Sequence, residues 1–237
     1  MAAADIPELL FLLDVDNTLV DNDALVADLR RQLVQSFGEA SAARYWSIFD
    51  ELRNELGYVD YLGALQRYRK EVVYASAGDQ RLLRMSAFLV DYPFASRLYP
   101  DALATVAHLG RIGPTVILSD GDVVFQPLKV QRSGLWDAVE GRVLIYVHKE
   151  QMLEQVQRLY PARHYVMVDD KLRILAAMKR AMGARLTTVF PRQGHYALDR
   201  AETAPHAPAD ITIGAISELL GFDARSFTPS AFQEKQA

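Results

Sequence analysis

An uninterrupted apolar run that ends in acidic residues constrains the fold of this chain more than any other feature. Residues Leu9 to Leu13 show no polar alternation, which is typical of a strand covered on both faces in a parallel sheet. The run continues into an Asp-x-Asp-x-Thr segment, and strand geometry puts Asp14 and Asp16 on the same side. Two carboxylates held so close repel each other unless a cation lies between them, and Mg²⁺ prefers such oxygen ligands. The alternative is an Asp-rich turn without a ligand.

Three later strand-like runs also end in polar residues. The runs and the residues that end or follow them are Thr115–Leu118 with Ser119, Asp120 and Gly121, Arg142–Val147 with Lys149, and His164–Val168 with Asp169 and Asp170. In open α/β sheets, ligands bind beyond the carboxyl ends of the strands. The sequence therefore predicts a parallel sheet with a polar site at one edge.

The order of these residues resembles the signature of the haloacid dehalogenase-like (HAD) superfamily, which is Asp-x-Asp-x-Thr, then Ser or Thr, then Lys, then an acidic pair. The matching residues are Asp14, Asp16, Thr18, Ser119, Lys149, Asp169 and Asp170. The segment Ser133 to Asp137 is similar to the family's Gly-Leu segment, and the resemblance runs from Leu9 to Leu220. It implies an α/β fold with a Rossmann-like parallel sheet core, helices on both faces and an inserted all-helical cap domain.

The gap between the first two motifs predicts the domain organisation. Its helical pattern resembles the family's C1-type cap, which closes over the active site. The expected cap helices are Ala24–Phe37, Ala40–Leu56, Tyr61–Tyr74 and Gln80–Val90. We expect a core from residues 1–20 and 93–224, a cap from 21–92 and a flexible tail from 225–237. Residues 192–210 are expected to form a loop.

The resemblance assigns a role to each catalytic candidate. Asp14 is the expected nucleophile, which forms an aspartyl-phosphate. Asp16 is the expected acid and base, since it protonates the leaving alcohol and then activates water. Ser119 is expected to hold a phosphoryl oxygen, and Lys149 is expected to screen the nucleophile against the anionic substrate.

The resemblance also implies substrate and metal contacts. Thr18, Asp120 and Gly121 are the substrate-binding candidates, although Thr18 is as well suited to capping a turn or helix. The expected cofactor is Mg²⁺, which neutralises charge on the phosphoryl oxygens. Its candidate ligands are Asp14, the backbone carbonyl of Asp16, Asp169 and Asp170.

The fourth motif departs from the family pattern. Relatives often carry a further acid one helical turn after the pair, where this chain has Ile174, which cannot bind a metal. We therefore expect direct ligation by Asp170, with Asp169 binding directly or through water, and the sequence does not decide which of the two is the direct ligand. Lys171 and Arg173 add positive charge beside the pair.

The amino-acid composition limits the binding partners and the cellular compartment that we expect for this chain. A chain of 237 residues with 50% hydrophobic content has room for one large α/β domain and a smaller insert. A net charge of −4 points to neither nucleic acid nor a membrane surface, and the absence of cysteine excludes thiolate chemistry. No segment resembles a signal peptide or a membrane span. We expect a cytoplasmic protein that acts on a small phosphorylated metabolite, and the oligomeric state stays open.

The leading functional hypothesis is a Mg²⁺-dependent phosphatase of a small phosphomonoester. A haloacid dehalogenase is the first alternative, but dehalogenases of this family lack the Asp16 acid and need no metal. A phosphomutase would use a sugar hydroxyl as acceptor, and the sequence does not separate it from a hydrolase. A non-enzymatic phospho-Asp switch, resembling a receiver domain, would place its aspartate on a later strand and have no helical insert.

Overall fold

A parallel sheet places the polar strand ends at one edge. The computed structural model describes residues 6–72 and 79–228, and within these residues six parallel strands pair in the order β3-β2-β1-β4-β5-β6. The bounds are β1 Leu9–Leu13, β2 Thr115–Asp120, β3 Val143–Tyr146, β4 His164–Val168, β5 Leu186–Pro191 and β6 Ile211–Ile213. Because β1 pairs with β2 on one side and with β4 on the other, its carboxyl end is the switch point where ligands bind in such sheets.

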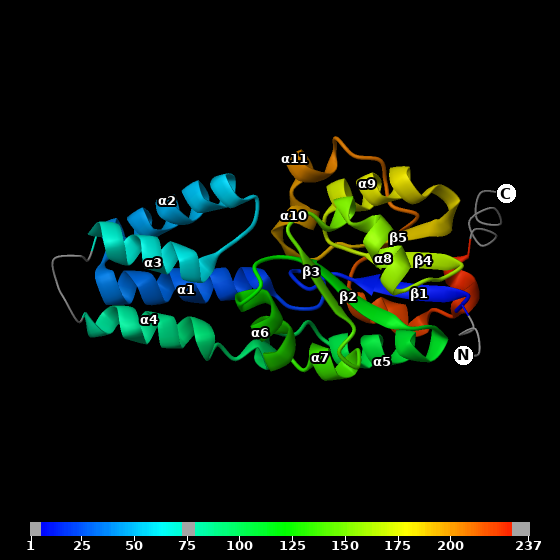
Figure 1. Ribbon diagram of the computed structural model, residues 1–237, viewed down its shortest axis with the longest axis horizontal. Helices are drawn as coiled ribbons and strands as arrows, with labels where there is room; N and C mark the ends of the chain where they lie inside the picture. The colour runs from blue at the N-terminus through cyan, green and yellow to red at the C-terminus, as the bar shows by residue number, and fades with distance from the viewer. Residues whose placement is uncertain (1–5, 73–78, 229–237) are drawn as a thin grey trace.

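Alternate residues of β1 pack on opposite faces of the sheet. Leu9, Phe11 and Leu13 share an apolar cluster with residues of α5, whereas Leu10 and Leu12 share a second cluster with residues of α8 and α9. These helices are α5 Ala102–Ile112, α8 Leu153–Leu159 and α9 Leu172–Met182. Figure 1 shows α5 and α9 on opposite sides of the strands. The predicted parallel sheet with helices on both faces is therefore confirmed.

Four further helices belong to the core, and only the first of them, α6, matches a predicted helix. They are α6 Phe125–Arg132, α7 Leu135–Ala138, α10 Gly194–Leu198 and α11 Arg200–Thr203. The prediction of a loop over residues 192–210 is wrong, because α10 and α11 both fall in it. The carboxylate of Asp199 accepts a 2.8 Å hydrogen bond from the amide of Ala201 and caps α11, and Ala197 of α10 is buried.

The chain remains packed on the core beyond the predicted end of the domain. A 3₁₀ turn at Ala224–Phe227 places the fully buried Phe227 ring edge-on to Phe11, with the ring centroids 5.1 Å apart. The backbone carbonyl of Phe227 also accepts a 2.8 Å hydrogen bond from the Thr187 hydroxyl. The expected flexible tail over 225–237 therefore begins with ordered residues, and residues 229–237 lie outside the described part.

The segment between β1 and β2 forms the helical insert, which we define as α1 to α4. Its helices are α1 Asn22–Phe37, α2 Glu39–Leu56, α3 Tyr61–Val72 and α4 Gln80–Val90, close to the predicted ranges. Residues 73 and 74 of the third predicted helix lie outside the described residues. Figure 1 shows the insert beside the sheet, with its helices running nearly parallel or antiparallel to one another. In the described part of the chain, no helix is long and apolar enough to cross a membrane.

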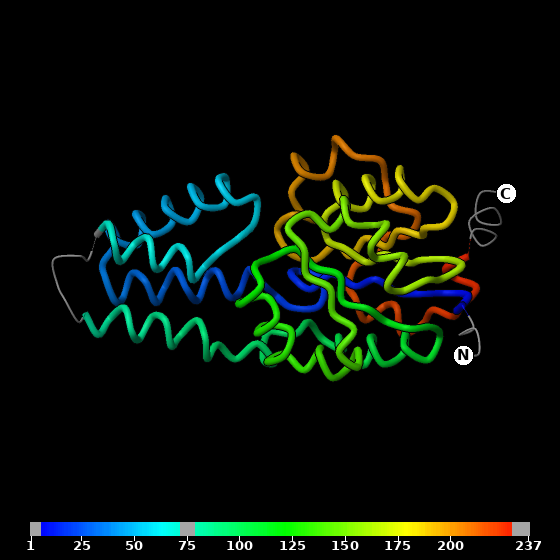
Figure 2. The backbone as a smooth tube through the Cα atoms, in the orientation of Figure 1, coloured from blue at the N-terminus to red at the C-terminus, as the bar shows by residue number. Residues whose placement is uncertain are grey.

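The two chain segments that join the insert to the core run side by side (Figure 2). Val20 forms an antiparallel bridge with Leu98, and the amide of Asp21 donates a 2.7 Å hydrogen bond to the carbonyl of Arg97. The carboxylate of Asp28 on α1 accepts hydrogen bonds from the Tyr92 hydroxyl and the Arg97 guanidinium. We call this pair of segments, residues 19–21 and 97–99, the connecting ribbon.

Candidate active site

The carboxyl ends of β1, β2 and β4 and the segment after β3 bring the predicted catalytic groups into contact. The Lys149 amine lies 2.5 Å from Oδ1 of Asp14 and 2.6 Å from Oδ2 of Asp169. The Ser119 hydroxyl donates a 3.3 Å hydrogen bond to the same Asp14 oxygen. All four side chains are buried. The strand register thus joins residues from four separate segments in one network of contacts centred on Asp14 and Lys149.

Lys149 carries its charge deep inside the protein. Burial disfavours the charged amine, but the carboxylates of Asp14 and Asp169 outweigh it and raise the pKa of Lys149 well above the ordinary lysine value. The amine also donates a 3.2 Å hydrogen bond to the carbonyl of Leu118. Lys149 therefore holds the Asp14 carboxylate in one orientation and balances part of its charge.

Asp14, Asp169 and Asp170 form the acidic cluster. Each offers a carboxylate oxygen, and these oxygens all lie within 4.8 Å of one another. Burial raises the pKa of Asp169 to about 6, and burial together with Asp169 raises the pKa of Asp170 well above its usual range. Three clustered, desolvated acids are costly without a positive partner.

The free oxygens of the acidic cluster fit a hard divalent cation. Oδ2 of Asp14 and both carboxylate oxygens of Asp170 are buried and have no hydrogen-bond partner among the described residues. Asp169 is already engaged, since it lies beside Lys149 and accepts a 2.8 Å hydrogen bond from the amide of Lys171. Oxygen donors of this kind are the ligands that Mg²⁺ prefers. The geometry thus favours Asp170 over Asp169 as a direct ligand.

Asp16 occupies a different environment from Asp14. Its side chain is 27% exposed and pairs with the amine of Lys129, which is only 1% exposed. The same amine donates a 3.0 Å hydrogen bond to the side-chain oxygen of Asn22. The Gln126 amide lies 3.5 Å from Asp16 and 3.0 Å from the Ser119 hydroxyl. Asp16 is therefore held in place while one side of its carboxylate stays accessible.

Sequence reasoning missed Lys129 and Gln126. Their spacing of three residues in a helix puts them on one face, which is the face that also carries the buried Phe125 and Val130. The sequence does contain one indication of Lys129, since a lysine between apolar positions soon after a motif-bearing strand can be a buried site residue. Such a lysine is more often solvated, which is why the pattern alone did not select it.

The predicted substrate-binding residues divide into two groups. Asp120 and Gly121 line the cavity described below, and the Asp120 carboxylate accepts a 2.8 Å hydrogen bond from the amide of Lys149. Thr18 is fully buried, and its hydroxyl accepts a 3.1 Å hydrogen bond from the amide of Asp170. The expected contact of Thr18 with substrate is therefore not made here, since its side chain faces the fourth motif and supports it.

A cavity of about 450 Å³ opens above this site, between the insert and the core. The core supplies Asp16, Gln126 and Lys129 to its wall, whereas Asp14 lies deeper and is 4% exposed. Other lining residues include Arg53, Tyr58 and Tyr61 from the insert and Lys171, Arg173 and Tyr196 from the core. The cavity has room for a small molecule, and the insert forms part of its boundary.

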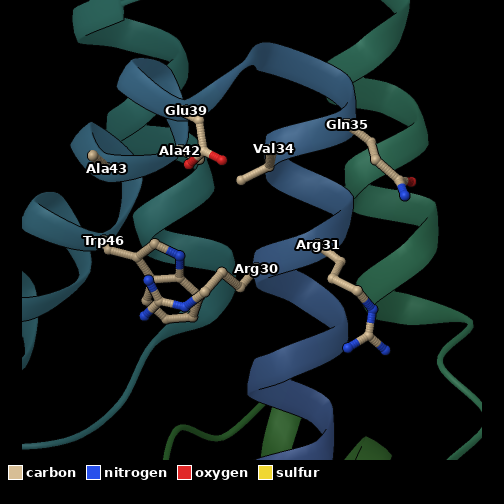
Figure 3. A pocket seen from close by; sticks show the side chains of 8 residues that line it. All are labelled: Arg30, Arg31, Val34, Gln35, Glu39, Ala42, Ala43 and Trp46. Carbon is tan, nitrogen blue, oxygen red and sulfur yellow. The ribbon is translucent and has the colours of Figure 1, made fainter.

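The insert also contains a cavity of its own, of about 350 Å³ (Figure 3). The Arg30 guanidinium lies 4.8 Å from the centre of the Trp46 ring there. The other lining residues are Arg31, Val34, Gln35, Glu39, Ala42 and Ala43. None of the predicted site residues lines this cavity, so it is separate from the candidate active site.

Comparison with known proteins assigns the family. Residues 9–181 match the family model of haloacid dehalogenase-like hydrolases. A crystal structure of a protein described as a haloacid dehalogenase-like hydrolase, from Burkholderia xenovorans LB400, has 66% sequence identity and a TM-score of 0.85, and the match covers 92% of this chain and 100% of that one. The chain belongs to the haloacid dehalogenase-like hydrolase family.

More distant members of the family share the fold. The L-2-haloacid dehalogenase of Xanthobacter autotrophicus has 17% identity and a TM-score of 0.58, and the match covers 91% of this chain and 98% of that one. A HAD-type hydrolase from Bacillus subtilis, solved with bound magnesium, has 17% identity and a TM-score of 0.59 with the same coverage. No curated protein matches the chain closely enough to count as a relative. These HAD-like structures extend the fold assignment to proteins of different chemistry.

Proposed function

We propose that this HAD-like hydrolase is a Mg²⁺-dependent phosphatase that hydrolyses a small phosphomonoester through an aspartyl-phosphate intermediate. The observation that carries the proposal is the placement of Asp16. Its carboxylate lies on the cavity wall two residues after Asp14, and Lys129 and Gln126 hold it in place. A positioned acid beside a nucleophile is the arrangement that acid–base catalysis of ester cleavage requires.

The residues support a two-step reaction. In the first step the Asp14 carboxylate attacks phosphorus, and the P–O bond to the alcohol breaks as Asp16 donates a proton to the departing oxygen. In the second step Asp16 takes a proton from water, which attacks the phosphorus of phosphoryl-Asp14 and releases inorganic phosphate and free Asp14. Lys149 and Ser119 orient the nucleophile through its Oδ1 atom.

The acidic cluster is the proposed metal site. Asp14 and Asp170 would hold Mg²⁺ through their unpartnered oxygens, together with the Asp16 carbonyl, and Asp169 would act beside them. When bound, the ion supplies positive charge that stabilises the phosphoryl oxygens. The hydroxyl of Ser119 and the wall at Asp120 and Gly121 would contact the phosphoryl group from the other side.

Dehalogenation of a haloacid is the second candidate. It is favoured by the fold shared with the Xanthobacter enzyme, but that likeness is equally close to the magnesium-bound hydrolase. A dehalogenase would need neither the Asp16 acid nor the free oxygens of Asp170. A phosphomutase would share the first step and use a sugar hydroxyl in the second. The family assignment to hydrolases leaves a non-enzymatic switch without support.

The test compares two product assays on one preparation. Release of inorganic phosphate is measured across small phosphomonoesters with and without Mg²⁺, and halide release is measured with chloropropionate in EDTA. We expect Mg²⁺-dependent phosphate release, with a loss of about 10²- to 10⁴-fold in Asp16→Asn. Halide release that survives EDTA, with no phosphate release, would reverse the assignment.

A further inference from the structure

Positive side chains gather on the side of the cavity where the insert meets the core. Arg53 comes from α2 of the insert, whereas Lys171 and Arg173 follow β4 and Tyr196 belongs to α10. All four line the main cavity, and they also line an adjoining cavity of about 130 Å³ with Leu172 and Glu202. We call Arg53, Lys171 and Tyr196 the junction site.

The junction site is connected by direct contacts across the boundary. The Arg53 guanidinium donates a 3.1 Å hydrogen bond to the Tyr196 hydroxyl, and the Lys171 amine lies 4.9 Å from the centre of the same ring. The insert and the core therefore present two cations to one side of the cavity, one beside the Tyr196 hydroxyl and the other over its ring. A hydroxyl and two cations form a donor set suited to an oxyanion.

The cations around the cavity differ in whether they have a direct ion-pair partner. Lys129 is paired with Asp16, and Arg173 is paired with Glu150 at 3.3 Å. In contrast, neither Arg53 nor Lys171 has a carboxylate within 4 Å in the part of the chain that the structure describes.

The acidic cluster acts on Lys171 only at longer range: burial disfavours the charged amine, but the charges of Asp170, Asp14 and Asp169 outweigh it and raise the pKa of Lys171. The other acids near this wall have other partners or lie in solvent. Asp120 accepts from the amide of Lys149, and Asp122 accepts from the amides of Val124 and Phe125 at the start of α6. Glu202 is exposed at the rim of the smaller cavity. The junction site thus retains positive charge that no described carboxylate cancels by direct contact.

We propose that the substrate carries a second anionic group, which binds at the junction site while its phosphate ester lies at Asp14. This inference rests on the proposed phosphatase function and specifies its substrate class as a phosphomonoester with a carboxylate or a second phosphate. Because Arg53 belongs to the insert and Lys171 to the core, both parts of the protein would contact such a group. A neutral ester lacks this contact and is a poorer substrate.

The experiment uses three phosphate esters of one three-carbon chain. They end in a hydroxyl (propanediol monophosphate), a carboxylate (phosphonooxypropanoate) and a second phosphate (propanediol bisphosphate). With Mg²⁺ present, we expect kcat/KM for an anionic ester to exceed that of the hydroxyl ester by on the order of 10- to 100-fold, as charge-assisted hydrogen bonds allow. The better of the two anionic esters identifies the group.

Variants of Arg53 and Lys171, with a matched control, test whether these two residues bind the second anionic group. Arg53→Gln and Lys171→Gln should each reduce the ratio of anionic to neutral kcat/KM by about 10-fold or more. Arg84→Gln is the control, since Arg84 is an exposed arginine on α4 and lines neither cavity. It should leave the ratio unchanged. Equal kcat/KM for all three esters, or a ratio that neither junction variant alters, would overturn the junction site while leaving the phosphatase assignment intact.

A binding measurement separates the two proposals. Calorimetry on Asp14→Asn protein, which cannot form the intermediate, measures the affinity for the same three esters. Tighter binding of an anionic ester that depends on Arg53, without turnover by the wild-type protein, would support the junction site and refute the phosphatase. Absence of both turnover and preferential binding would refute both.

Discussion

The junction site lines the main cavity, whereas the acidic cluster is buried and does not line it, and the two are built in different ways. The acidic cluster comes entirely from strand ends of one sheet, and each of its residues is at most 4% exposed. The junction site joins α2 of the insert to α10 and the start of α9, and the Arg53 side chain lies on the surface. Sheet register therefore fixes the proposed chemical groups, whereas the placement of the insert fixes the proposed recognition groups.

Replacing the proposed nucleophile, which belongs to the acidic cluster, should reduce activity more than any other change. Asp14→Asn keeps the size of the side chain but cannot form the aspartyl-phosphate, so we expect kcat to fall by on the order of 10⁴-fold or more. Phosphate release under saturating substrate is the measurement, with circular dichroism as the check on folding. A variant that retains most of its activity would show that the acidic cluster does not contain the nucleophile.

Metal binding should depend on Asp170. With free Mg²⁺ at 100 times its Kd, the wild-type protein should gain about 2.7 kcal/mol in free energy of unfolding. Asp170→Asn should lose most of this gain, because the unpartnered oxygens of Asp170 are the proposed ligands. Without Mg²⁺, the variant should be at least as stable as the wild type, since it removes a buried carboxylate from beside Asp169. Thermal melts with Mg²⁺ and with EDTA measure both effects, and equal Mg²⁺ stabilisation of the two proteins would contradict the assignment.

Lys129 belongs to neither region but pairs with Asp16 on the wall of the same cavity. Lys129→Met preserves apolar volume beside Phe94 and Phe125 but removes the charge that holds Asp16. We expect kcat to fall about 10-fold with little change in KM, as expected when a charge-assisted hydrogen bond to a catalytic group is lost. Lys129→Arg should restore part of the rate, because it returns a cation.

The stability cost of Lys129→Met should be below the 3–5 kcal/mol typical of breaking a fully buried pair, because water can reach Asp16. Urea unfolding measures it. A rate loss explained entirely by unfolded protein would remove Lys129 from the site.

The smallest expected effect concerns the pH dependence of stability. It involves His164 at the start of β4, the end of the strand away from the acidic cluster. Burial and the nearby charge of Lys179 lower the pKa of His164. The unfolded chain takes up a proton near pH 6.5 while folded His164 stays neutral, so stability should fall as pH drops below about 6.5. His164→Gln should weaken this part of the pH dependence. Urea unfolding at pH values above and below this range is the measurement, and an unchanged pH dependence would show that other groups cause it.

The sequence predicted the acidic cluster because its geometry is local to strand ends. Asp14 follows β1 directly, and Asp169 follows β4, which pairs with β1 in register. Parallel pairing then places the residues that follow the strands close together. The same argument predicted Ser119 at the end of β2 and Lys149 beyond β3. Four apolar runs were enough to locate these groups before any tertiary contact was known.

The junction site could not be predicted in this way. Arg53 lies in a helix more than 35 residues from Asp14, and its contact with Tyr196 joins residues 143 positions apart. Tyr196 itself fell in a segment expected to be a loop. Lys171 was noticed beside the fourth motif, but only the fold shows that it faces the same cavity as Arg53. Contacts between residues so far apart in the chain leave no periodic pattern in the sequence.

The connecting ribbon determines how the two sides of the cavity can move. The two segments of the connecting ribbon are joined by the Val20–Leu98 bridge and by backbone hydrogen bonds. Sliding or twisting one segment against the other would break these bonds. Bending the connecting ribbon disturbs those bonds least. We therefore expect bending across the connecting ribbon to be the easiest motion of the insert relative to the core. Such a motion would change the separation between Arg53 and Lys171, whereas the acidic cluster, which lies wholly in the core, would keep its dimensions.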